Sequence, residues 1–512
     1  MALYFGSYLV GLLAVVTALF VVGYAYILHF YQYWKRRNLP YLEPAAPWGN
    51  VEKPFWRTVS VGEEMRDIHL EAKRRGLKVC GIYNMMQVNL VLIDLDIVKQ
   101  VLTKDFNNFV DRGVYTNEKD DPLTCHLFAL SGQRWRNLRV KMSPTFTSGK
   151  MKTMFSTLVS CGEVLEKYVE GHIDNVEGLD VKEVLGKFST DIIGSCAFGL
   201  ECNSFKDPNS PFRKYGREAF EVSTLDLIEL AIADNFPELA RKLKITTIRR
   251  DVSSFFRKVV NDTIAYRQKN NYARNDFLQL LIEIMNNKSS NEDGFKGDGK
   301  SLTMDEAAAQ CFVFFLAGFE TSSTTMTFAL YEMAQHQDVQ DRVREEIKTV
   351  LAKHDGQVTY DSLSELKYMK QVIDETLRIY SPVPFITRVA AEDYKIPQED
   401  VVIEKGTKVV VAIQGIHMDE EIYENPLKFD PERFSDENKK GRHPYAHIPF
   451  GEGPRICIGE RFGIMQTKVG LTSILKDFRV TLNKKTQNPL RLSTRAFVPT
   501  AEAGVWVNLE RL

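Results

Sequence analysis

The chain contains the stretch Phe450-Gly451-Glu452-Gly453-Pro454-Arg455-Ile456-Cys457-Ile458-Gly459, in which one cysteine lies in a glycine-rich loop. A run typical of a helix, residues 460–466, follows at once. We therefore expect Cys457 at or near a helix N-terminus, where backbone N–H groups and the helix dipole favour a thiolate. A thiolate held in this way can ligate a metal from one side, and the glycines let a flat cofactor approach the backbone. The alternative interpretation is a buried cysteine in a turn.

Length and composition fit a folded globular protein. The 512 residues suffice for one large domain or several ordinary ones, and 44% of them are hydrophobic and 26% charged. The net charge of −1 gives no support for nucleic-acid binding. The seven cysteines are odd in number and include no Cys-x-x-Cys pair, which argues against a disulfide framework and a structural zinc site. A reducing compartment fits best.

The N-terminal segment predicts a membrane anchor. Residues 1–34 contain no Lys, Arg, Asp or Glu, and residues 8–28 are almost wholly apolar, which is long enough for a transmembrane helix. Lys35-Arg36-Arg37 follows, and positive charge marks the cytoplasmic flank of a span. A cleavable signal peptide would have basic residues before the apolar run and a small-residue cleavage site after it, and neither is present. A buried core helix is disfavoured because the segment is terminal and apolar all round.

The remaining chain divides into a short hinge and one large domain. Residues 35–50 combine the basic cluster with three prolines, which predicts a stop-transfer signal followed by a stiff, extended linker. Residues 51–512 are then expected to form one large domain. Within it, residues 286–299 are rich in Asn, Ser, Asp and Gly and predict a solvated loop.

A long helix is expected in the middle of the domain. Thr303 and Glu306 form a capping-box pattern, and a helical run continues to about Gln335. Such a helix has on the order of 30 residues and a length of roughly 45 Å. It is a poor membrane span, because Glu320 and a run of hydroxyl side chains interrupt it. Short strand-like runs at residues 88–93 and 407–413 predict small β-sheets beside the helices.

The middle of this helix carries the sequence Ala317-Gly318-Phe319-Glu320-Thr321. An acid and a hydroxyl adjoin there, beside a glycine that weakens the helix by about 1 kcal/mol relative to alanine. The alternative is a kinked core helix in which Thr321 hydrogen-bonds to its own carbonyls.

Two further motifs contain charged side chains and hydrogen-bond donors. Glu375 and Arg378 are three apart, so they share a helical face, and Arg433 follows inside the run 430–434. Trp135 and Arg139 are one turn apart, and both present donors suited to carboxylates. Taken singly, each arginine would more commonly be a surface charge and Trp135 ordinary core.

In their order along the chain, these motifs resemble those of the cytochrome P-450 superfamily, in its microsomal form. The matching patterns are Trp-x-x-x-Arg, Ala-Gly-x-Glu-Thr, Glu-x-x-Arg, Pro-Glu-Arg-Phe and Phe-x-x-Gly-x-Arg-x-Cys-x-Gly. The resemblance covers essentially the whole chain. The sequences of residues 143–152 and 312–323 are most similar to those of the insect family-six members of the xenobiotic-metabolising clan.

The resemblance implies a mainly α-helical fold with small β-sheets, forming one large haem domain behind an N-terminal transmembrane helix. It implies haem b, with Cys457 as the axial ligand of its iron, and a thiolate ligand favours O–O cleavage. Glu320 and Thr321 would serve proton delivery. The haem propionates would be held by Arg112, Trp135, Arg139, Arg388 and Arg455. A structural charge triad would consist of Glu375, Arg378 and Arg433. The substrate pocket would include Phe128, Phe315, Ala317, Val383, Phe385 and Phe497, for which plain hydrophobic core is the alternative.

The implied activity is a monooxygenase of the unspecific type, which inserts one oxygen atom of O2 into lipophilic substrates. These would be xenobiotics such as plant toxins or insecticides, or endogenous lipids and hormones. Because the chain has no flavin or nicotinamide fingerprint, NADPH electrons would arrive through a separate flavoprotein, cytochrome P-450 reductase, with cytochrome b5 as a second candidate partner. A basic docking patch is predicted at Arg136, Lys141, Lys439, Lys440 and Arg442, with a solvated charged surface as the alternative.

The implied location is the endoplasmic reticulum membrane, with a single anchor and a cytosolic catalytic domain that takes substrates from solution or from the bilayer. Two rival functions remain: a haem-thiolate isomerase or dehydratase, and a non-catalytic haem sensor. The intact pair Glu320-Thr321 argues against both.

Overall fold

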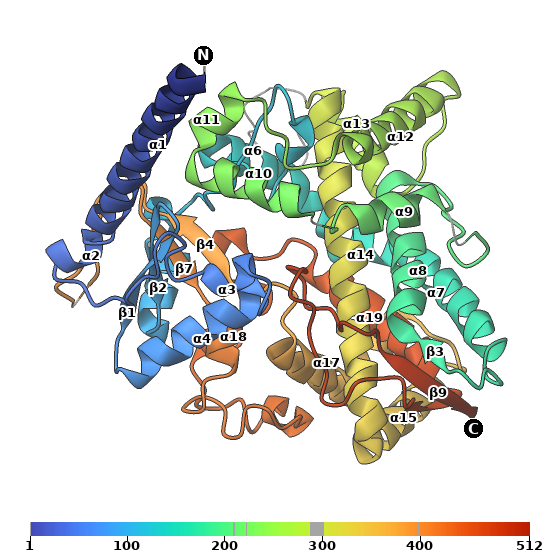
Figure 1. The fold of residues 1–512 in the computed structure, drawn as a ribbon. Helices are drawn as coiled ribbons and strands as arrows, with labels where there is room; N and C mark the ends of the chain where they lie inside the picture. Colours follow the sequence, from blue (N-terminus) through green and yellow to red (C-terminus); the bar gives the residue numbers. More distant parts are fainter. Residues whose placement is uncertain (1, 208–209, 222, 287–301, 398) are drawn as a thin grey trace.

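Helices dominate the chain, with three small sheets beside them (Figure 1). The computed structural model describes residues 2–207, 210–221, 223–286, 302–397 and 399–512, so the predicted loop lies outside the described residues from residue 287 on. The helices are α1 Ala2–Phe30, α2 Tyr33–Arg36, α3 Glu52–Phe55, α4 Val61–Arg74, α5 Leu95–Lys99, α6 Gly132–Met142, α7 Ser148–Glu170, α8 Val181–Ile193, α9 Pro211–Glu218, α10 Thr224–Asn235, α11 Pro237–Lys242, α12 Arg250–Lys269, α13 Phe277–Met285, α14 Met304–Gln335, α15 Gln337–Ala352, α16 Tyr360–Glu365, α17 Lys367–Ile379, α18 Ile413–His417 and α19 Glu460–Leu475. The strands are β1 Val79–Asn84, β2 Gln87–Leu92, β3 Leu179–Asp180, β4 Ile386–Val389, β5 Tyr394–Lys395, β6 Val402–Ile403, β7 Lys408–Val411, β8 Phe478–Leu482 and β9 Trp506–Arg511.

The long central helix α14 begins as the sequence predicts. The Thr303 hydroxyl accepts a hydrogen bond from the Glu306 N–H at 3.1 Å, and the Thr303 N–H donates to the Glu306 carboxylate at 2.9 Å. The helix continues without interruption through Gly318 to Gln335. Gly318 instead permits close packing, because a Cβ there would lie 2.5 Å from the side chain of Ile193 on α8.

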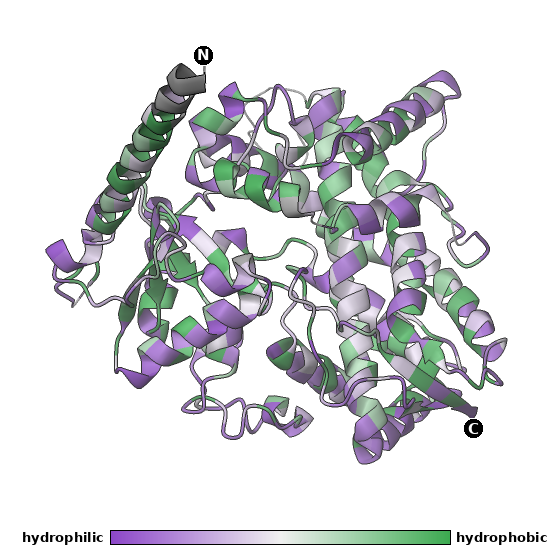
Figure 2. Ribbon diagram, viewed as in Figure 1, coloured by the Kyte–Doolittle hydropathy of each residue, from purple (hydrophilic) through white to green (hydrophobic). Residues whose placement is uncertain are grey.

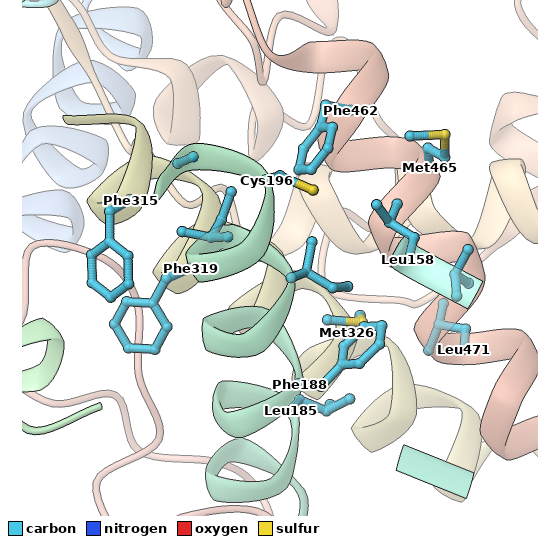
Figure 3. Packing of buried hydrophobic residues seen from close by; sticks show 14 of the residues in the cluster. Leu158, Leu185, Phe188, Cys196, Phe315, Phe319, Met326, Phe462, Met465 and Leu471 are labelled. Atoms are coloured by element: carbon cyan, nitrogen blue, oxygen red, sulfur yellow. The ribbon is translucent and has the colours of Figure 1, made fainter. Parts of the chain in front are cut away.

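The helical core forms where α8, α14 and α19 meet. Figure 3 shows Phe188 of α8 and Met326 of α14 side by side, with Leu471 of α19 close to them. Gly470 of α19 makes room for both side chains, since a Cβ there would lie 2.8 Å from the Phe188 ring and overlap the Met326 sulfur. This packing fixes α14 between α8 and the helix that follows the cysteine loop.

The largest sheet has the strand order β1-β2-β7-β4. β2 and β7 are parallel, whereas β1 pairs with β2 and β4 pairs with β7 in antiparallel register. The sheet lies on the α1 side of the molecule, apart from the helical core, with α4 and α18 beside it (Figure 1). The runs 88–93 and 407–413 are strands as predicted, within one or two residues.

Beyond its first turns, the N-terminal helix α1 is mainly hydrophobic (Figure 2). Its segment Val10–Phe30 has a mean hydropathy of 2.3 and none of it is buried inside the protein. By length and composition it could cross a membrane, and it is the one such helix in the part of the chain that the structure describes.

The segment predicted to be an extended linker packs on the sheet, as does Trp34 just before it. Trp34 is buried over Gly81 of β1, and its indole N–H donates to the Ile82 carbonyl at 3.2 Å. The Gly81 N–H donates to the Pro40 carbonyl at 2.8 Å, and Gly81 O accepts from the Leu42 N–H at 3.1 Å. The prolines stiffen the chain but leave their carbonyls free to accept, and burial of Leu42 adds the apolar contact that a free linker lacks.

Candidate functional site

The cysteine loop precedes α19, as the sequence predicts. Residues 453–455 form a single 3-10 turn, Gly459 is the N-cap of α19, and the Cys457 N–H donates to the Phe450 carbonyl at 2.9 Å. Gly453 has φ +75°, and a Cβ at this position would overlap the carbonyl oxygen of Leu102. The close approach of the loop to residue 102 therefore requires glycine.

Cys457 keeps accessible surface because it lines a cavity inside the protein. Burial raises the pKa of the thiol above its ordinary value. A backbone hydrogen bond from Gly459 and the charges of Arg139 and Arg112 act in the opposite direction but do not outweigh burial. A metal cation on the sulfur would favour the thiolate that the sequence predicts.

The cavity runs between α14 and the cysteine loop. It brings together residues from distant parts of the chain, among them Arg112, Trp135, Arg139, Ala317, Thr321, Val383, Arg388, Arg455 and Cys457. All five residues that the resemblance assigns to the propionates therefore face one space with Cys457. Arg112 follows Asp111, which forms an isolated bridge with Val389 of β4. The other four lie on α6, on β4 and in the turn 453–455.

Arg455 is held rigidly at the edge of this cavity. Its guanidinium donates to the carbonyls of Val110 at 2.7 Å and Leu130 at 2.7 Å, and lies 4.1 Å from the centre of the Trp135 ring. Asp111 is 3.8 Å away, a weak counter-charge with 38% of its side chain exposed. Burial and repulsion from Arg112 lower the pKa of Arg455 to about 9.

Arg388 and Arg112 are less well satisfied. Each has a buried Nε without a hydrogen-bond partner among the described residues. Burial, Arg112 and Arg455 together hold the pKa of Arg388 well below its ordinary value, and burial lowers the pKa of Arg112 to about 10. Buried donors without partners are costly, so this edge of the cavity is built for an anion.

The donor set thus fits a flat, dianionic cofactor with a metal ion at its centre. Arginines suit carboxylates in number and geometry, and a cysteine sulfur suits a soft metal. In the described part of the chain, no group of three or more His, Cys, Asp or Glu side chains could hold a metal ion by itself. The single sulfur of Cys457 is consistent with a metal whose other ligands belong to the cofactor.

The motif on α14 divides between two faces of the helix. Ala317, Gly318 and Thr321 line the cavity. The Thr321 hydroxyl donates to the Ala317 carbonyl at 2.5 Å, as the structural alternative predicts, and its oxygen can still accept a hydrogen bond. Glu320 does not line the cavity: its carboxylate pairs with Lys182 of α8 at 2.7 Å. Sequence analysis missed Lys182, because it lies 138 residues away and belongs to no motif.

The predicted substrate residues also divide. Phe128, Ala317 and Val383 line the cavity, whereas Phe315, Phe385 and Phe497 do not. Phe315 is fully buried and packs on Phe319 at a ring separation of 5.7 Å. Figure 3 shows these two rings together, apart from Phe462 of α19.

Periodicity accounts for the positions of Phe315 and Phe385. Phe315 lies two residues before Ala317, so it points to the opposite side of α14. Phe385 adjoins Ile386, whose side chain lines the cavity, and successive residues of an extended segment face opposite sides. Phe385 packs instead on Phe497, which is 46% exposed. The helical spacing would have found two lining residues that we missed, Val313 and Phe314.

The predicted charge triad lies together in the core. The Arg378 guanidinium donates to both Glu375 oxygens at 2.7 and 2.8 Å, and both side chains are fully buried. Arg433 Nε lies 3.4 Å from Glu375, and Nη2 donates to the Asn425 carbonyl at 3.0 Å. Arg378 also donates to the His417 carbonyl at 2.8 Å, so the triad ties α17 to α18 and to the segment before the cysteine loop.

Two of the five residues of the predicted basic patch line one groove. A surface groove beside the cysteine loop is lined by Lys439 and Arg442, together with Lys370 and the acids Asp374 and Glu460. Lys440, Arg136 and Lys141 do not line it. The groove is therefore mixed in charge.

Comparison with known proteins gives a consistent result. The family model described as Cytochrome P450 matches residues 47–506. Among similar curated proteins, "Probable cytochrome P450 6a14" of Drosophila melanogaster is 42% identical over 96% of this chain and 98% of its own length. "Cytochrome P450 6A1" of Musca domestica is 42% identical over 99% of both chains. The resemblance to insect family-six proteins that the sequence motifs indicated is thus confirmed.

Proposed function

Since the chain belongs to the cytochrome P450 family, we propose that it is a haem-thiolate monooxygenase of the unspecific type that inserts one oxygen atom of O2 into lipophilic small molecules. Family membership implies haem iron as the cofactor. The observation that carries the proposal is the meeting of Cys457, four arginines and Thr321 around one cavity.

The residues present would hold haem in a defined orientation. Cys457 would bind the iron, and Trp135, Arg112, Arg139, Arg388 and Arg455 would bind the two carboxylates, whose negative charge satisfies the unpartnered Nε atoms of Arg112 and Arg388. The bound haem supplies the redox chemistry that activates dioxygen. Apolar walls exclude water from the space above it.

Thr321 and Glu320 would supply protons. The Thr321 oxygen lies at the cavity wall. Glu320, the preceding residue of α14, keeps 12% of its side chain exposed for exchange with solvent. Ala317, Val313 and Phe314 make the adjoining wall small or apolar, which favours lipophilic substrates such as plant toxins, insecticides or endogenous lipids.

Electrons would come from NADPH through a separate reductase, with cytochrome b5 as a second candidate. The groove lined by Lys439 and Arg442 adjoins the cysteine loop and offers a docking place on the sulfur side. The apolar helix α1, followed by Lys35-Arg36-Arg37, supports a single anchor in the endoplasmic reticulum with residues 51–512 in the cytosol. The boundaries 1–34 and 35–50 are part of this proposal.

The rival activities, an isomerase or dehydratase and a haem sensor, make less use of a hydroxyl at the cavity wall beside an acid with access to solvent. Production of an oxygenated compound that depends on reductase and NADPH would exclude both rivals.

The first experiment is the carbon monoxide difference spectrum of the reduced protein in membranes. We expect a strongly red-shifted Soret band in wild type that is lost in Cys457→Ser. Cys161→Ser, on α7 and outside the cavity, is the control and should keep the band. A haem-loaded, folded wild type without the shifted band would refute thiolate ligation and the mechanism built on it.

A further inference from the structure

Gln310 lies on the cavity-facing side of α14 but outside the cavity. The residues of α14 that line the cavity begin at Val313 and include Phe314, Ala317 and Thr321. Gln310 precedes these four by three, four, seven and eleven residues, spacings that place it on the same face of the helix. Its side chain is nevertheless fully buried. This face of α14 is therefore covered at residue 310, where the cavity ends along the helix.

The side-chain amide of Gln310 binds the backbone that covers it, in the segment 125–127. Its Oε1 accepts a hydrogen bond from the Leu127 N–H at 2.9 Å, and its Nε2 donates to the Cys125 carbonyl at 3.3 Å. Nε2 also donates to the Glu306 carbonyl at 3.0 Å, one turn earlier on α14. Both amide hydrogens and the amide oxygen are thus bound to main-chain groups, which fix the orientation of the amide.

The same segment forms part of the cavity wall, because Leu127 and Phe128 line the cavity. The chain turns directly after them, since the N–H groups of Ala129 and Leu130 both donate to the His126 carbonyl at 3.0 Å. This turn connects the backbone bound by Gln310 to the side chains at the wall.

The other end of the segment is bound to the arginines of the cavity edge. The Phe128 carbonyl accepts from Arg112 at 3.0 Å and from Arg455 at 3.3 Å, and the Leu130 carbonyl accepts from Arg455 at 2.7 Å. The Arg112 guanidinium also lies 4.1 Å from the centre of the Phe128 ring. Residues 125–130 are therefore held at two places, by Gln310 on α14 and by the two arginines.

We propose that Gln310 is a positioning residue for substrate: by binding Cys125 and Leu127 it holds residues 125–130 across α14 and so sets how far a lipophilic molecule can extend along the cavity. Eleven residues separate Gln310 from Thr321, which is roughly 16 Å along a helix. A molecule lying along α14 meets Leu127 near the end of this length, and a loosened segment admits a longer molecule. This inference rests on the proposed function, since it assigns an end wall to the same cavity.

Hydrogen exchange of the haem-loaded protein tests the contact directly. In wild type the Leu127 amide should exchange slowly, because its hydrogen is bound to the oxygen of a fully buried side chain. Gln310→Met keeps the length of the side chain and removes its hydrogen bonds, so exchange in residues 125–130 should become roughly tenfold faster or more. A Leu127 amide that exchanges as fast in wild type as an exposed one would refute the contact without any variant.

Gln340 of α15 offers a matched control. It is fully buried, its Oε1 accepts from the Val480 N–H at 2.9 Å, and its Nε2 donates to the carbonyls of Val480 at 2.8 Å and Met333 at 3.0 Å. It does not line the cavity. Gln340→Met should therefore lower stability and speed exchange at Val480, while exchange in residues 125–130 stays as in wild type.

The second test measures the length of molecule that the cavity accepts. N-alkylimidazoles from N-butyl to N-dodecyl are titrated into the haem-loaded protein, and binding is followed by the shift of the Soret band. In Gln310→Met the affinity for long chains should rise relative to short ones, by roughly fourfold for each further methylene group that becomes buried. Gln340→Met should keep the wild-type preference for chain length. The same preference in Gln310→Met as in wild type would overturn the proposal, even if exchange became faster.

The proposed function and the role of Gln310 fail in different ways. A wild type that lacks the red-shifted carbon monoxide band or forms no oxygenated product would refute the monooxygenase function, while exchange of the Leu127 amide would still report on Gln310. A normal band, with exchange and chain-length preference unchanged in Gln310→Met, would refute the role of Gln310 alone. If Gln310→Met does not load haem, Gln310→Leu takes its place in both tests.

Discussion

At the scale of single residues, the arginines around the cavity lose hydration and gain little compensating charge from the protein. Arg388 is 1% exposed and Arg455 is 2% exposed. Burial lowers the pKa of each guanidinium, and repulsion from Arg112 lowers it further. Such a cluster is destabilising by itself and becomes favourable once two carboxylates lie among its members. Stability of the cavity edge is therefore tied to the cofactor.

Replacement of Arg388 tests this linkage. In Arg388→Leu we expect haem to be lost to an excess of a haem-binding protein roughly 10 to 100 times faster, since charge-assisted hydrogen bonds contribute about 1.5–3 kcal/mol. Arg134→Gln is the control: Arg134 is 50% exposed, pairs with Glu118 and does not line the cavity, so the rate of loss should be unchanged. An unchanged rate in Arg388→Leu would mean that this arginine does not hold the cofactor.

At the scale of elements, close packing is decided by glycines at two crossings. Gly318 brings α8 against α14, and Gly81 brings α2 against β1. The second contact packs α2 on the sheet, because Trp34 lies over Gly81 and Arg37 pairs with Glu404 at 2.7 Å. The apolar helix α1 is therefore followed by a packed segment.

Gly81→Ala tests the contact between α2 and β1. A Cβ at this position would lie 2.6 Å from the Trp34 ring, so overpacking should lower the free energy of unfolding by about 1–3 kcal/mol. Gly149→Ala, on α7 with open space around it, is the control and should be neutral or slightly stabilising. Equal denaturant midpoints for the two variants would show that Trp34 is not seated on Gly81.

At the scale of the whole molecule, buried neutral histidines link stability to pH. His69 of α4 is 1% exposed, and neither ring nitrogen has a hydrogen-bond partner among the described residues. Burial lowers the pKa of His69 to about 4, with a smaller contribution from Lys73. Below pH 6.5 the unfolded chain binds a proton that the folded one does not, so stability falls as the pH falls from 6.5 toward 4.

His69→Leu should remove this dependence. We expect the free energy of unfolding at pH 7 to change by less than about 1 kcal/mol, because no hydrogen bond is lost. Between pH 6.5 and 4, the acid-induced loss of stability should be smaller than in wild type by roughly 3 kcal/mol, at about 1.4 kcal/mol per pH unit. Denaturant unfolding across this range measures it, and parallel curves for variant and wild type would contradict the assignment.

Some features of this protein follow from the sequence alone, since neighbouring residues determine them. The capping box at Thr303, the loop that places Cys457 before a helix and the pair Glu375–Arg378 all depend on contacts within a few residues. Hydrophobic periodicity likewise gave the long helix α14, the strands β2 and β7 and the apolar helix α1.

Other features depend on packing between distant segments, which no local pattern contains. The convergence of Arg112, Arg388 and Arg455 on one cavity, the docking of Trp34 on β1 and the pairing of Lys182 with Glu320 join residues far apart in the chain. The direction in which Phe315 and Glu320 point was decided by which face of α14 each neighbouring element covers. Short-range bonding specifies the elements, whereas long-range burial decides which side chains meet.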